Sequence, residues 1–308
     1  MEEEIRGCFL TVTVISYNSE LFISETLKSI AEQSSKDIQI ILSDDASIDN
    51  TVDILKNWKK LHENSFYEIL LLESKVNKGV IENFSRTFEK AKGLWLKAIA
   101  GDDLFYTDAI KSMRIDAKTC LETSVIIGKA KIFGQESKEN AIIPREKLVK
   151  NLNTINQFKK YIYEGYTFPG VSFLIKTKLL KEIDVFKHAK GKVEDIPFQL
   201  ELLTKGYLFK ISDHIYVKYR KHINNVSRKN EDEILSKVYL DYQKILLKYA
   251  FKDFKIVYVM NTFWNLCLGK LIFLFGNKGS FCLIINKIKM KLQPKRFFNM
   301  ISRVYRTN

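Results

Sequence analysis

Three pairs of adjacent acidic residues could carry chemistry in this chain: Asp44-Asp45, Asp102-Asp103 and Glu194-Asp195. Clustered carboxylates raise one another's pKa, and a divalent cation relieves that repulsion. Hard oxygen ligands suit Mg²⁺ or Mn²⁺, which can neutralise a diphosphate as it leaves. Each pair alone also has a simpler reading, because acidic residues form turns and begin helices. Their meaning therefore depends on the elements that position them.

The first hundred residues alternate between strand and helix patterns. Short apolar, β-branched runs predict strands, and apolar residues at helical spacing predict the helices between them. Asn18 or Ser19 is expected to cap the first helix, and Gly93 to end the third. This order is typical of parallel strands joined by right-handed crossovers. The predicted strands cover 9–16, 37–43, 69–72 and 94–100.

Polar residues collect where three of these strands end. The ends read Ser16-Tyr17-Asn18, Ser43-Asp44-Asp45 and Gly101-Asp102-Asp103. In parallel α/β sheets, ligands bind outside the carboxyl ends of the strands. The sequence therefore predicts that two of the three acidic pairs share one ligand-binding rim.

The pattern changes after about residue 121. Segments 124–134, 170–176 and 208–220 are strand-like, and Glu194-Asp195 opens a predicted helix. From residue 231 onward the chain reads as helical. The second half is therefore expected to be mixed sheet and loops, followed by a helical extension.

Composition indicates a packed globular protein. The chain has 308 residues, and 46% of them are hydrophobic, which fits one large α/β domain with an appendage or two modest domains. Its four cysteines have neither metal-ligand nor redox spacing, so free thiols in a reducing compartment are expected. The acidic start, Met1-Glu2-Glu3-Glu4, is not the pattern of a signal peptide.

The net charge of +14 is concentrated at the C-terminal end. No Asp or Glu follows Asp253, and a basic tail of this kind predicts an anionic partner. Residues 256–275 are apolar but interrupted by polar residues, so they are marginal as a membrane span and favour peripheral association with lipid. The basic residues after Asp253 are Lys255, Lys270, Lys278, Lys287, Lys289, Lys291, Lys295, Arg296, Arg303 and Arg306.

Taken together, these motifs resemble the family 2 glycosyltransferases with the GT-A fold. The resemblance covers residues 9 to about 120 closely and then thins to isolated motifs up to about residue 228. Thr13 to Asn18 resembles the family's first strand, and Ile40 to Thr51 its second-strand signature, where an Asp reads the base, usually uracil. Asn77-Lys78-Gly79 resembles the Asn-x-Gly turn before the third helix.

The remaining motifs of the resemblance are acidic or basic. Gly101-Asp102-Asp103 stands where the family places its Asp-x-Asp metal motif, although Ala100 and Gly101 occupy positions where many members carry its first acidic residue. Glu194-Asp195 stands where an acceptor-side pair supplies the base. Tyr219 to His222, with Ser227, resembles a late motif near the donor phosphates.

The resemblance implies roles for particular residues. It implies Asp103 on the metal with Asp102 on the ribose or also on the metal, and Asp195, with Glu194, as the catalytic base. The implied cofactor is Mn²⁺ or Mg²⁺, and the co-substrate is a nucleotide sugar. The residues implied in donor binding are Ser16, Tyr17, Asn18, Asp44, Asp45, Asn77, Lys78, Gly79, Asp102 and His222.

The implied fold is an α/β, GT-A type, Rossmann-like nucleotide-diphospho-sugar transferase domain with a mixed, mostly parallel sheet. It would span residues 1–230, with a nucleotide-sugar half to about 120 and an acceptor half from 121, followed by a basic helical C-terminal extension over 231–308. The implied reaction is inverting transfer, with UDP-sugar favoured, to a glycan or lipid-linked acceptor. Such an enzyme of surface polysaccharide synthesis is expected in the cytoplasm, peripherally at the inner face of the membrane.

Two alternatives come from other classes of protein. A metal-dependent nucleotidyltransferase would use clustered carboxylates and a divalent cation in the same way, and it remains an alternative. A nucleic-acid-binding protein would explain the charge, but carboxylates at the sheet rim would repel phosphate, so no nucleic acid is expected as a partner. A dinucleotide-dependent dehydrogenase is excluded because the first turn, Ser16 to Ser19, lacks the glycine-rich fingerprint.

Overall fold

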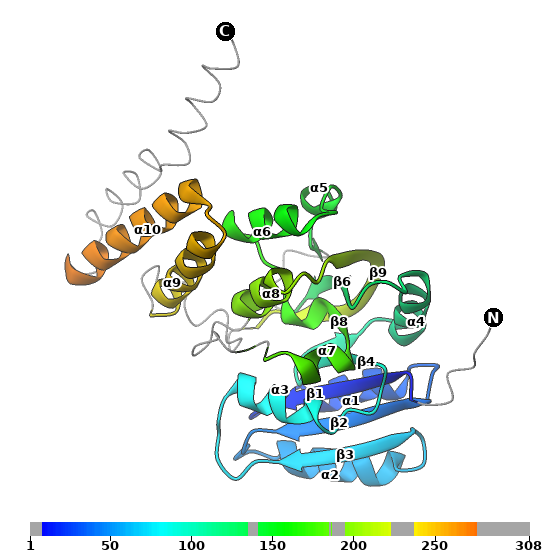
Figure 1. Ribbon diagram of the computed structural model, residues 1–308. Coiled ribbons are helices and arrows are strands. Elements are labelled where there is room, and N and C mark those ends of the chain that lie inside the picture. The colour runs from blue at the N-terminus through cyan, green and yellow to red at the C-terminus, as the bar shows by residue number, and fades with distance from the viewer. Residues whose placement is uncertain (1–7, 135–140, 185, 187–194, 223–236, 276–308) are drawn as a thin grey trace.

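A computed structural model describes residues 8–134, 141–184, 186, 195–222 and 237–275 (Figure 1). The strands are β1 (Leu10–Ser16), β2 (Ile38–Asp44), β3 (Glu68–Glu73), β4 (Trp95–Ala100), β5 (Leu104–Phe105), β6 (Val125–Phe133), β7 (Ile142–Ile143), β8 (Phe173–Lys176) and β9 (Phe209–Arg220). The helices are α1 (Ile23–Ala31), α2 (Thr51–His62), α3 (Val80–Phe88), α4 (Ala109–Thr119), α5 (Glu146–Val149), α6 (Ile155–Tyr163), the 3₁₀ turn η1 (Gly170–Ser172), α7 (Thr177–Glu182), α8 (Asp195–Thr204), α9 (Lys237–Lys252) and α10 (Ile256–Phe275).

All the strands belong to one mixed sheet in the order β3-β2-β1-β4-β8-β6-β9-β5, with β7 paired to β6. Strands β1 to β4 are parallel to one another, as the alternating strand and helix pattern predicts. Strand β8 enters antiparallel beside β4, while β6 and β9 pair in parallel. The predicted α/β fold with a mixed, mostly parallel sheet is confirmed.

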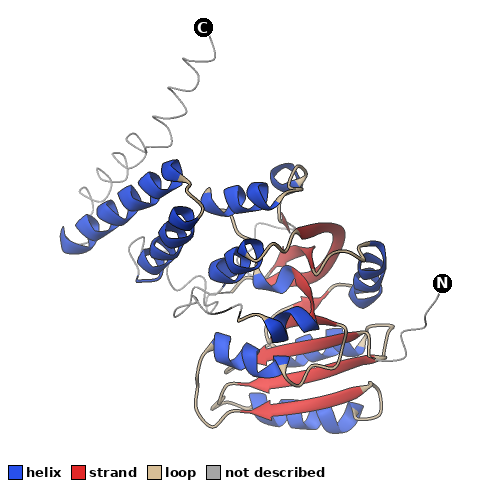
Figure 2. Ribbon diagram, viewed as in Figure 1, coloured by secondary structure: helices blue, strands red, loops and turns tan. Residues whose placement is uncertain are grey.

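Helices cover both faces of the sheet (Figure 2). Within β2, Ile38, Ile40 and Leu42 pack toward α1 and α2, whereas Ile41 packs in the cluster on the opposite face. Each side chain of this size stabilises the fold by about 1.5–3 kcal/mol when it is buried. The alternation fixes the register of β2, because a one-residue slip would exchange its two faces.

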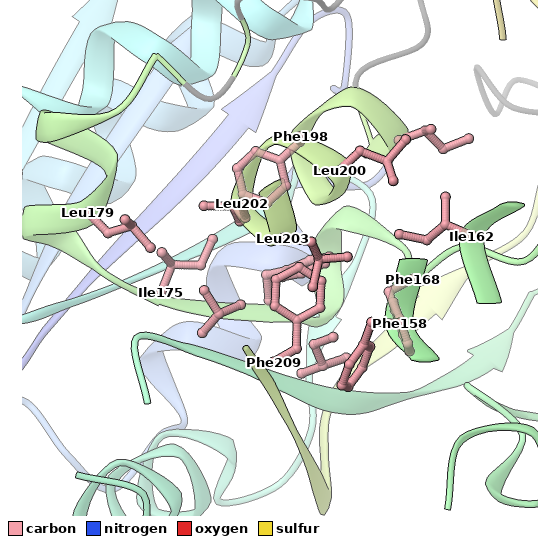
Figure 3. Packing of buried hydrophobic residues seen from close by; sticks show 14 of the residues in the cluster. Phe158, Ile162, Phe168, Ile175, Leu179, Phe198, Leu200, Leu202, Leu203 and Phe209 are labelled. Atoms are coloured by element: carbon pink, nitrogen blue, oxygen red, sulfur yellow. The ribbon is translucent and has the colours of Figure 1, made fainter. Parts of the chain in front are cut away.

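The second apolar cluster joins the second half of the sheet to the helices that follow it. Side chains of α6, α8, β8 and β9 pack together there, including Phe158, Leu203 and Phe209, with Phe168 from the loop before η1 (Figure 3). Helix α9 adds Tyr249 and other residues to the same cluster. The boundary predicted near residue 230 falls within 223–236, outside the described residues.

Two predicted helix ends are wrong. The N-cap position of α1 is Phe22, not Asn18 or Ser19, and it makes no side-chain cap hydrogen bond. Helix α3 ends at Phe88 with Glu89 as its C-cap in a right-handed conformation, so Gly93 does not terminate it. Gly93 instead allows close packing, because a Cβ there would lie 2.3 Å from the Thr11 backbone nitrogen.

The later elements follow the sequence in part. Strands β6, β8 and β9 match the three predicted strand-like segments, and α8 begins at Asp195 as predicted. Short helices α5, α6 and α7 lie between them and were not predicted. Glu194 and Ser227 lie outside the described residues. Among the helices in the described ranges, none is long and apolar enough to cross a membrane.

Candidate active site

The loops after β1 and β2 are tied together by the first acidic pair. The Ser16 hydroxyl donates to Asp44 Oδ1 over 3.0 Å, because Ser16 and Asp44 face each other in the parallel register. Asp44 also accepts from the backbone nitrogen of Ser47 at 2.8 Å and from its hydroxyl at 2.5 Å. Asp44 is buried, so its carboxylate organises the loop of which it forms the start.

Asn18 joins the same two loops from the other side. Its side-chain oxygen accepts from the Ile48 backbone nitrogen at 2.9 Å, and its own backbone nitrogen donates to the Ser47 hydroxyl at 2.8 Å. Asn18 has a φ of 48°, a left-handed conformation that asparagine tolerates better than most residues. Tyr17, next to it, is 48% exposed and presents its ring at the rim.

Asp45 holds the turn before α3. Its two carboxylate oxygens accept from the backbone nitrogens of Lys78, at 2.9 Å, and Gly79, at 2.7 Å. Gly79 has a φ of 89°, which explains a glycine at the end of this Asn-x-Gly turn. Asn77 is exposed at its start, and the Lys78 ammonium lies 3.7 Å from Glu82. The predicted donor-binding residues of three strand ends are thus brought together.

Sequence reasoning missed two polar residues on the buried side of α3. Asn83 donates to the carbonyl of Ser43 at 3.1 Å and to that of Ser16 at 3.3 Å. Arg86 donates to the carbonyls of Asp44, at 2.6 Å, and Leu72, at 2.8 Å. Burial lowers the pKa of Arg86, opposed by the charges of Asp45 and Asp44. The signal available in the sequence was that Asn83 and Arg86 lie three positions apart, and therefore on one side of the predicted helix.

Asp102 lies beside the end of β9. Its Oδ2 is 2.9 Å from His222 Nε2, and its carbonyl accepts from Arg220 Nε at 2.7 Å. The His222 ring packs on Phe22, with ring centroids 4.7 Å apart. Strand β5, which directly follows Asp103, pairs antiparallel with β9, with Leu104 opposite Lys218. This pairing holds Asp102 close to the end of β9. The predicted late motif therefore meets the predicted metal motif.

Asp103 points into the protein rather than toward the rim. It is fully buried, its Oδ1 accepts from the Arg220 backbone nitrogen at 2.8 Å, and its Oδ2 has no hydrogen-bond partner among the described residues. Burial, reinforced by the charge of Asp102, raises its pKa well above the ordinary value for aspartate. Of the two carboxyl groups, only that of Asp102 is partly exposed.

Lys97, in the middle of β4, was also missed. It is fully buried and donates to the carbonyl of Val171 in η1. Desolvation lowers its pKa to about 7, opposed by the charge of Asp103. A charged residue inside a buried strand was the available signal, since lysine is almost never fully buried without a partner.

Asp195 begins α8 and contacts η1. A Cβ built on Gly170 would lie 2.9 Å from Asp195 Oδ1, so a glycine is needed for this close approach. Desolvation raises the pKa of Asp195 to about 6, opposed by a hydrogen bond from the Gly170 backbone. A carboxylate with this pKa is ionised at neutral pH and more basic than an ordinary aspartate, which suits a general base.

The sheet topology brings Asp195 to the same edge as Asp102. Trp95 and Leu96 of β4 lie opposite Lys176 and Ile175 of β8, so the antiparallel register runs from the start of β8 toward the end of β4. Turn η1, which precedes β8, therefore lies at the carboxyl end of β4, where Asp102 follows. The contact of Asp195 with Gly170 places Asp195, the described member of the third acidic pair, at this edge.

Comparison with known proteins identifies the group to which this arrangement belongs. Residues 11–184 match the family model described as Glycosyl transferase family 2. The chain belongs to glycosyltransferase family 2. It is 31% identical over 221 residues to a dTDP-rhamnosyl transferase, RfbG, of Shigella flexneri, covering 68% of this chain and 72% of that protein.

Two other comparisons cover nearly the whole family 2 chain. It is 23% identical to a GalNAc(5)-diNAcBac-PP-undecaprenol beta-1,3-glucosyltransferase of Campylobacter jejuni, over 96% of this chain and 97% of that protein. The structure of S. aureus TarS 1-349 in complex with UDP-GlcNAc superposes with a TM-score of 0.64 at 18% identity, over 93% and 77% of the two chains. The likeness to TarS shows that the fold is GT-A.

The residues of this glycosyltransferase fit a divalent cation shared with a substrate. The carboxylate of Asp102 and the imidazole of His222, two groups that can ligate a cation, lie 2.9 Å apart, and both are partly exposed. No group of three or more His, Cys, Asp or Glu side chains suited to a metal occurs within the part of the chain that the structure describes. Mg²⁺ and similar ions commonly take one or two protein ligands and complete their coordination with phosphate oxygens and water.

Proposed function

We propose that this glycosyltransferase moves a sugar from a nucleoside diphosphate to a hydroxyl of a glycan or lipid-linked acceptor, with inversion at the anomeric carbon. The observation that carries the proposal is the placement of Asp102 with His222, and of Asp195 with Gly170, at one sheet edge. The position of Asp102 and His222 suits a diphosphate and its cation, and the position of Asp195 suits a base. The names of the Shigella and Campylobacter relatives, a rhamnosyl and a glucosyl transferase, support sugar transfer.

The donor nucleotide would lie over the loops that follow β1 and β2. Tyr17 and Asn18 lie beside Asp44 and Asp45 there, with the Asn77-Lys78-Gly79 turn behind them. A carboxylate at this position accepts the imide N–H of uracil, so UDP-sugar is the favoured donor. Thymine presents the same N–H, and a carboxylate alone does not distinguish the two bases.

Asp102 and His222 are the groups we assign to the cation, in place of Asp103. Asp103 is buried, and the backbone of Arg220 already occupies one of its oxygens. Its role would be to fix the loop that carries Asp102 against the end of β9. The bound cation would stabilise the negative charge of the departing diphosphate.

Asp195 is the group we assign to proton removal from the acceptor hydroxyl. Its elevated pKa arises from desolvation, and the Gly170 contact fixes where its Oδ1 lies. As Asp195 takes the proton, the acceptor oxygen forms a bond to the anomeric carbon from the side opposite the diphosphate. The bond between that carbon and the diphosphate oxygen breaks at the same time. In this mechanism the Glu194-Asp195 pair must hold the base in position against the acceptor hydroxyl.

The acceptor and the location of the enzyme follow from the same proposal. The name of the Campylobacter relative specifies an undecaprenol-linked acceptor. With the basic C-terminal tail, this supports work on surface polysaccharide precursors in the cytoplasm, with the chain peripheral at the inner face of the membrane.

The test is incubation of the full chain with UDP-, dTDP- and GDP-sugars labelled in the sugar, with Mn²⁺ or Mg²⁺. Sugar transfer or slow donor hydrolysis releasing a nucleoside diphosphate is expected. Release of pyrophosphate from a nucleoside triphosphate and a sugar phosphate would instead identify a nucleotidyltransferase and overturn the proposal. The anomeric configuration of the product, read by NMR, tests inversion.

A further inference from the structure

The corner between α9 and α10 exposes five large apolar side chains. Phe254 is 88% exposed, and the exposed fractions of the other four lie between 43% and 69%. The two helices pack against each other beside the acceptor half (Figure 1). Single apolar residues are normal at a protein surface, but five large ones within thirteen residues of chain indicate an interaction site. We call this set the corner patch; it consists of Phe251, Phe254, Ile256, Met260 and Phe263.

Helix α10 is apolar on its outer side as well as on the side that packs on the protein, where Tyr258 and Val259 lie against the core. Ile256, Met260 and Phe263 recur at helical spacing on the outside, whereas Thr262 and Asn265 are buried. Asn265 donates to Gln243 of α9 at 3.4 Å. A helix packed on a protein normally buries its apolar face and exposes its polar face. The outward face of α10 is therefore built for contact with something other than water.

The backbone at the tip of the corner is strained. Phe254 has a φ of 53°, in the left-handed region that bulky side chains rarely occupy. Its side chain gains no packing within the protein that would offset this strain, since it is almost fully exposed. This conformation belongs to the C-terminal cap of α9, which is closed by a 2.9 Å hydrogen bond from the Lys255 backbone nitrogen to the Ala250 carbonyl. Glycine or asparagine would suit this backbone better, so the aromatic ring has a use outside the fold.

The corner is rigidly held and carries positive charge. Asp253 accepts from Lys159 at 2.9 Å and from the Tyr163 hydroxyl at 2.8 Å, which anchors the corner to α6. Asp253, the last acidic residue of the sequence, is therefore paired within the protein. Lys252 is exposed beside the patch, and every charged residue after Asp253 is basic.

We propose that the corner patch docks on an anionic phospholipid surface, with Phe254 and the outer face of α10 entering the headgroup region. Apolar side chains flanked by lysine are the composition of interfacial elements, and anionic headgroups complement the basic tail. A second copy of the chain fits less well, because two such corners would bring like charges together. The inference deepens the proposed membrane association and supplies its contact surface.

The docking also bears on catalysis. A lipid-linked acceptor presents its sugar close to the headgroups, and α9, which carries the corner, packs into the same apolar cluster as α8, whose first residue is Asp195. Docking through the corner would hold the acceptor half at a fixed distance from the lipid surface. It therefore raises turnover on lipid-linked acceptors without altering donor binding.

The experiment is co-sedimentation of the full chain with vesicles of phosphatidylcholine, with or without phosphatidylglycerol. We expect binding to the anionic vesicles that weakens as salt rises. Phe254→Asn should reduce vesicle binding about ten-fold while leaving thermal stability equal or higher, because asparagine tolerates the left-handed backbone. Phe263→Ser should reduce binding to a similar degree. Leu61→Gln, at an apolar side chain 79% exposed on α2, is the matched control and should bind as the unmodified chain does.

Several outcomes would overturn the docking surface. Unchanged vesicle binding by both Phe254→Asn and Phe263→Ser excludes it, as does equal binding to neutral and anionic vesicles. A dimer in solution that Phe254→Asn dissociates would assign the patch to a second copy. Hydrolysis of the nucleotide sugar, measured in each variant without vesicles, separates this result from the proposed activity, since the docking variants should retain it.

Discussion

The proposed donor and acceptor sides of the site hold their carboxylates in opposite ways. Asp44 and Asp45 each accept hydrogen bonds through both carboxylate oxygens from neighbouring loops. Asp195 is desolvated, and the Gly170 backbone supplies the hydrogen bond that opposes its raised pKa. Hydrogen bonds to the ionised form stabilise it and fix its geometry, whereas desolvation that outweighs such bonds raises basicity.

This difference separates binding from proton transfer. Groups that shape a nucleotide pocket must stay in place, so their oxygens accept from backbone nitrogens and serine hydroxyls of the surrounding loops. A group that takes a proton must keep an oxygen available and a pKa near the working pH. The predictions below test whether that division holds.

The largest expected effect is on turnover in Asp195→Asn. Removing the base should lower kcat by about 10³-fold, while affinity for the donor nucleotide stays nearly unchanged. Single-turnover kinetics and nucleotide titration measure the two quantities separately. Asp213→Asn, at an exposed carboxylate paired with Lys129, is the control and should leave both quantities intact. Substantial turnover in Asp195→Asn would remove Asp195 from the mechanism.

The next effect distinguishes the two carboxyl groups after β4. Asp102→Ala should weaken metal-dependent nucleotide binding about 100-fold, because the partly exposed carboxylate is lost. Asp103→Asn should retain the metal dependence, since that side chain is buried and bonded to the Arg220 backbone. Calorimetric titration of UDP with and without Mn²⁺ measures both. If Asp103→Asn alone abolished the metal dependence, the two assignments would be reversed.

The donor side was predictable from sequence because its signals are local. Its acidic motif and the Ser16-Tyr17-Asn18 motif lie at the ends of strands, and parallel strands bring their carboxyl ends to one edge. Its internal bonding was not predictable, because Asn83 and Arg86 act on carbonyls of other strands. A polar residue on a helix gives no indication of which backbone groups it meets.

The acceptor side was less predictable because its contacts depend on packing. Asp195 was found as a helix start, but its contact with Gly170 arises only once β8 lies antiparallel to β4. The same holds for Lys97 and the Val171 carbonyl. Neither the direction of β8 nor the helices α5 to α7 follows from hydrophobic periodicity, since short segments carry weak periodic signals.

A smaller effect is expected from Gly170→Ala. The added Cβ would lie 2.9 Å from Asp195 Oδ1, so the carboxylate or η1 must move. We expect kcat to fall about ten-fold with the donor KM unchanged, because misplacement of the base affects only the chemical step. Ser172→Ala, in the same turn, is the matched control and should retain turnover. A rise in donor KM alone would instead connect η1 with the donor side.

The smallest effect is the pH dependence that desolvation of Asp195 implies. Because its pKa is about 6, kcat/KM should rise about ten-fold per unit up to pH 6 and level off above it. The sign for stability is opposite. A folded-state pKa above the unfolded value means that ionisation of Asp195 destabilises the fold as pH rises between about 4 and 6. Asp195→Asn should therefore be more stable than the unmodified chain at pH 7, by about 3 kcal/mol in free energy of unfolding, and this advantage should shrink toward pH 4. Thermal melts across this range measure it. An advantage that persists at pH 4 would show that the asparagine acts through packing and that the carboxylate carries no desolvation cost.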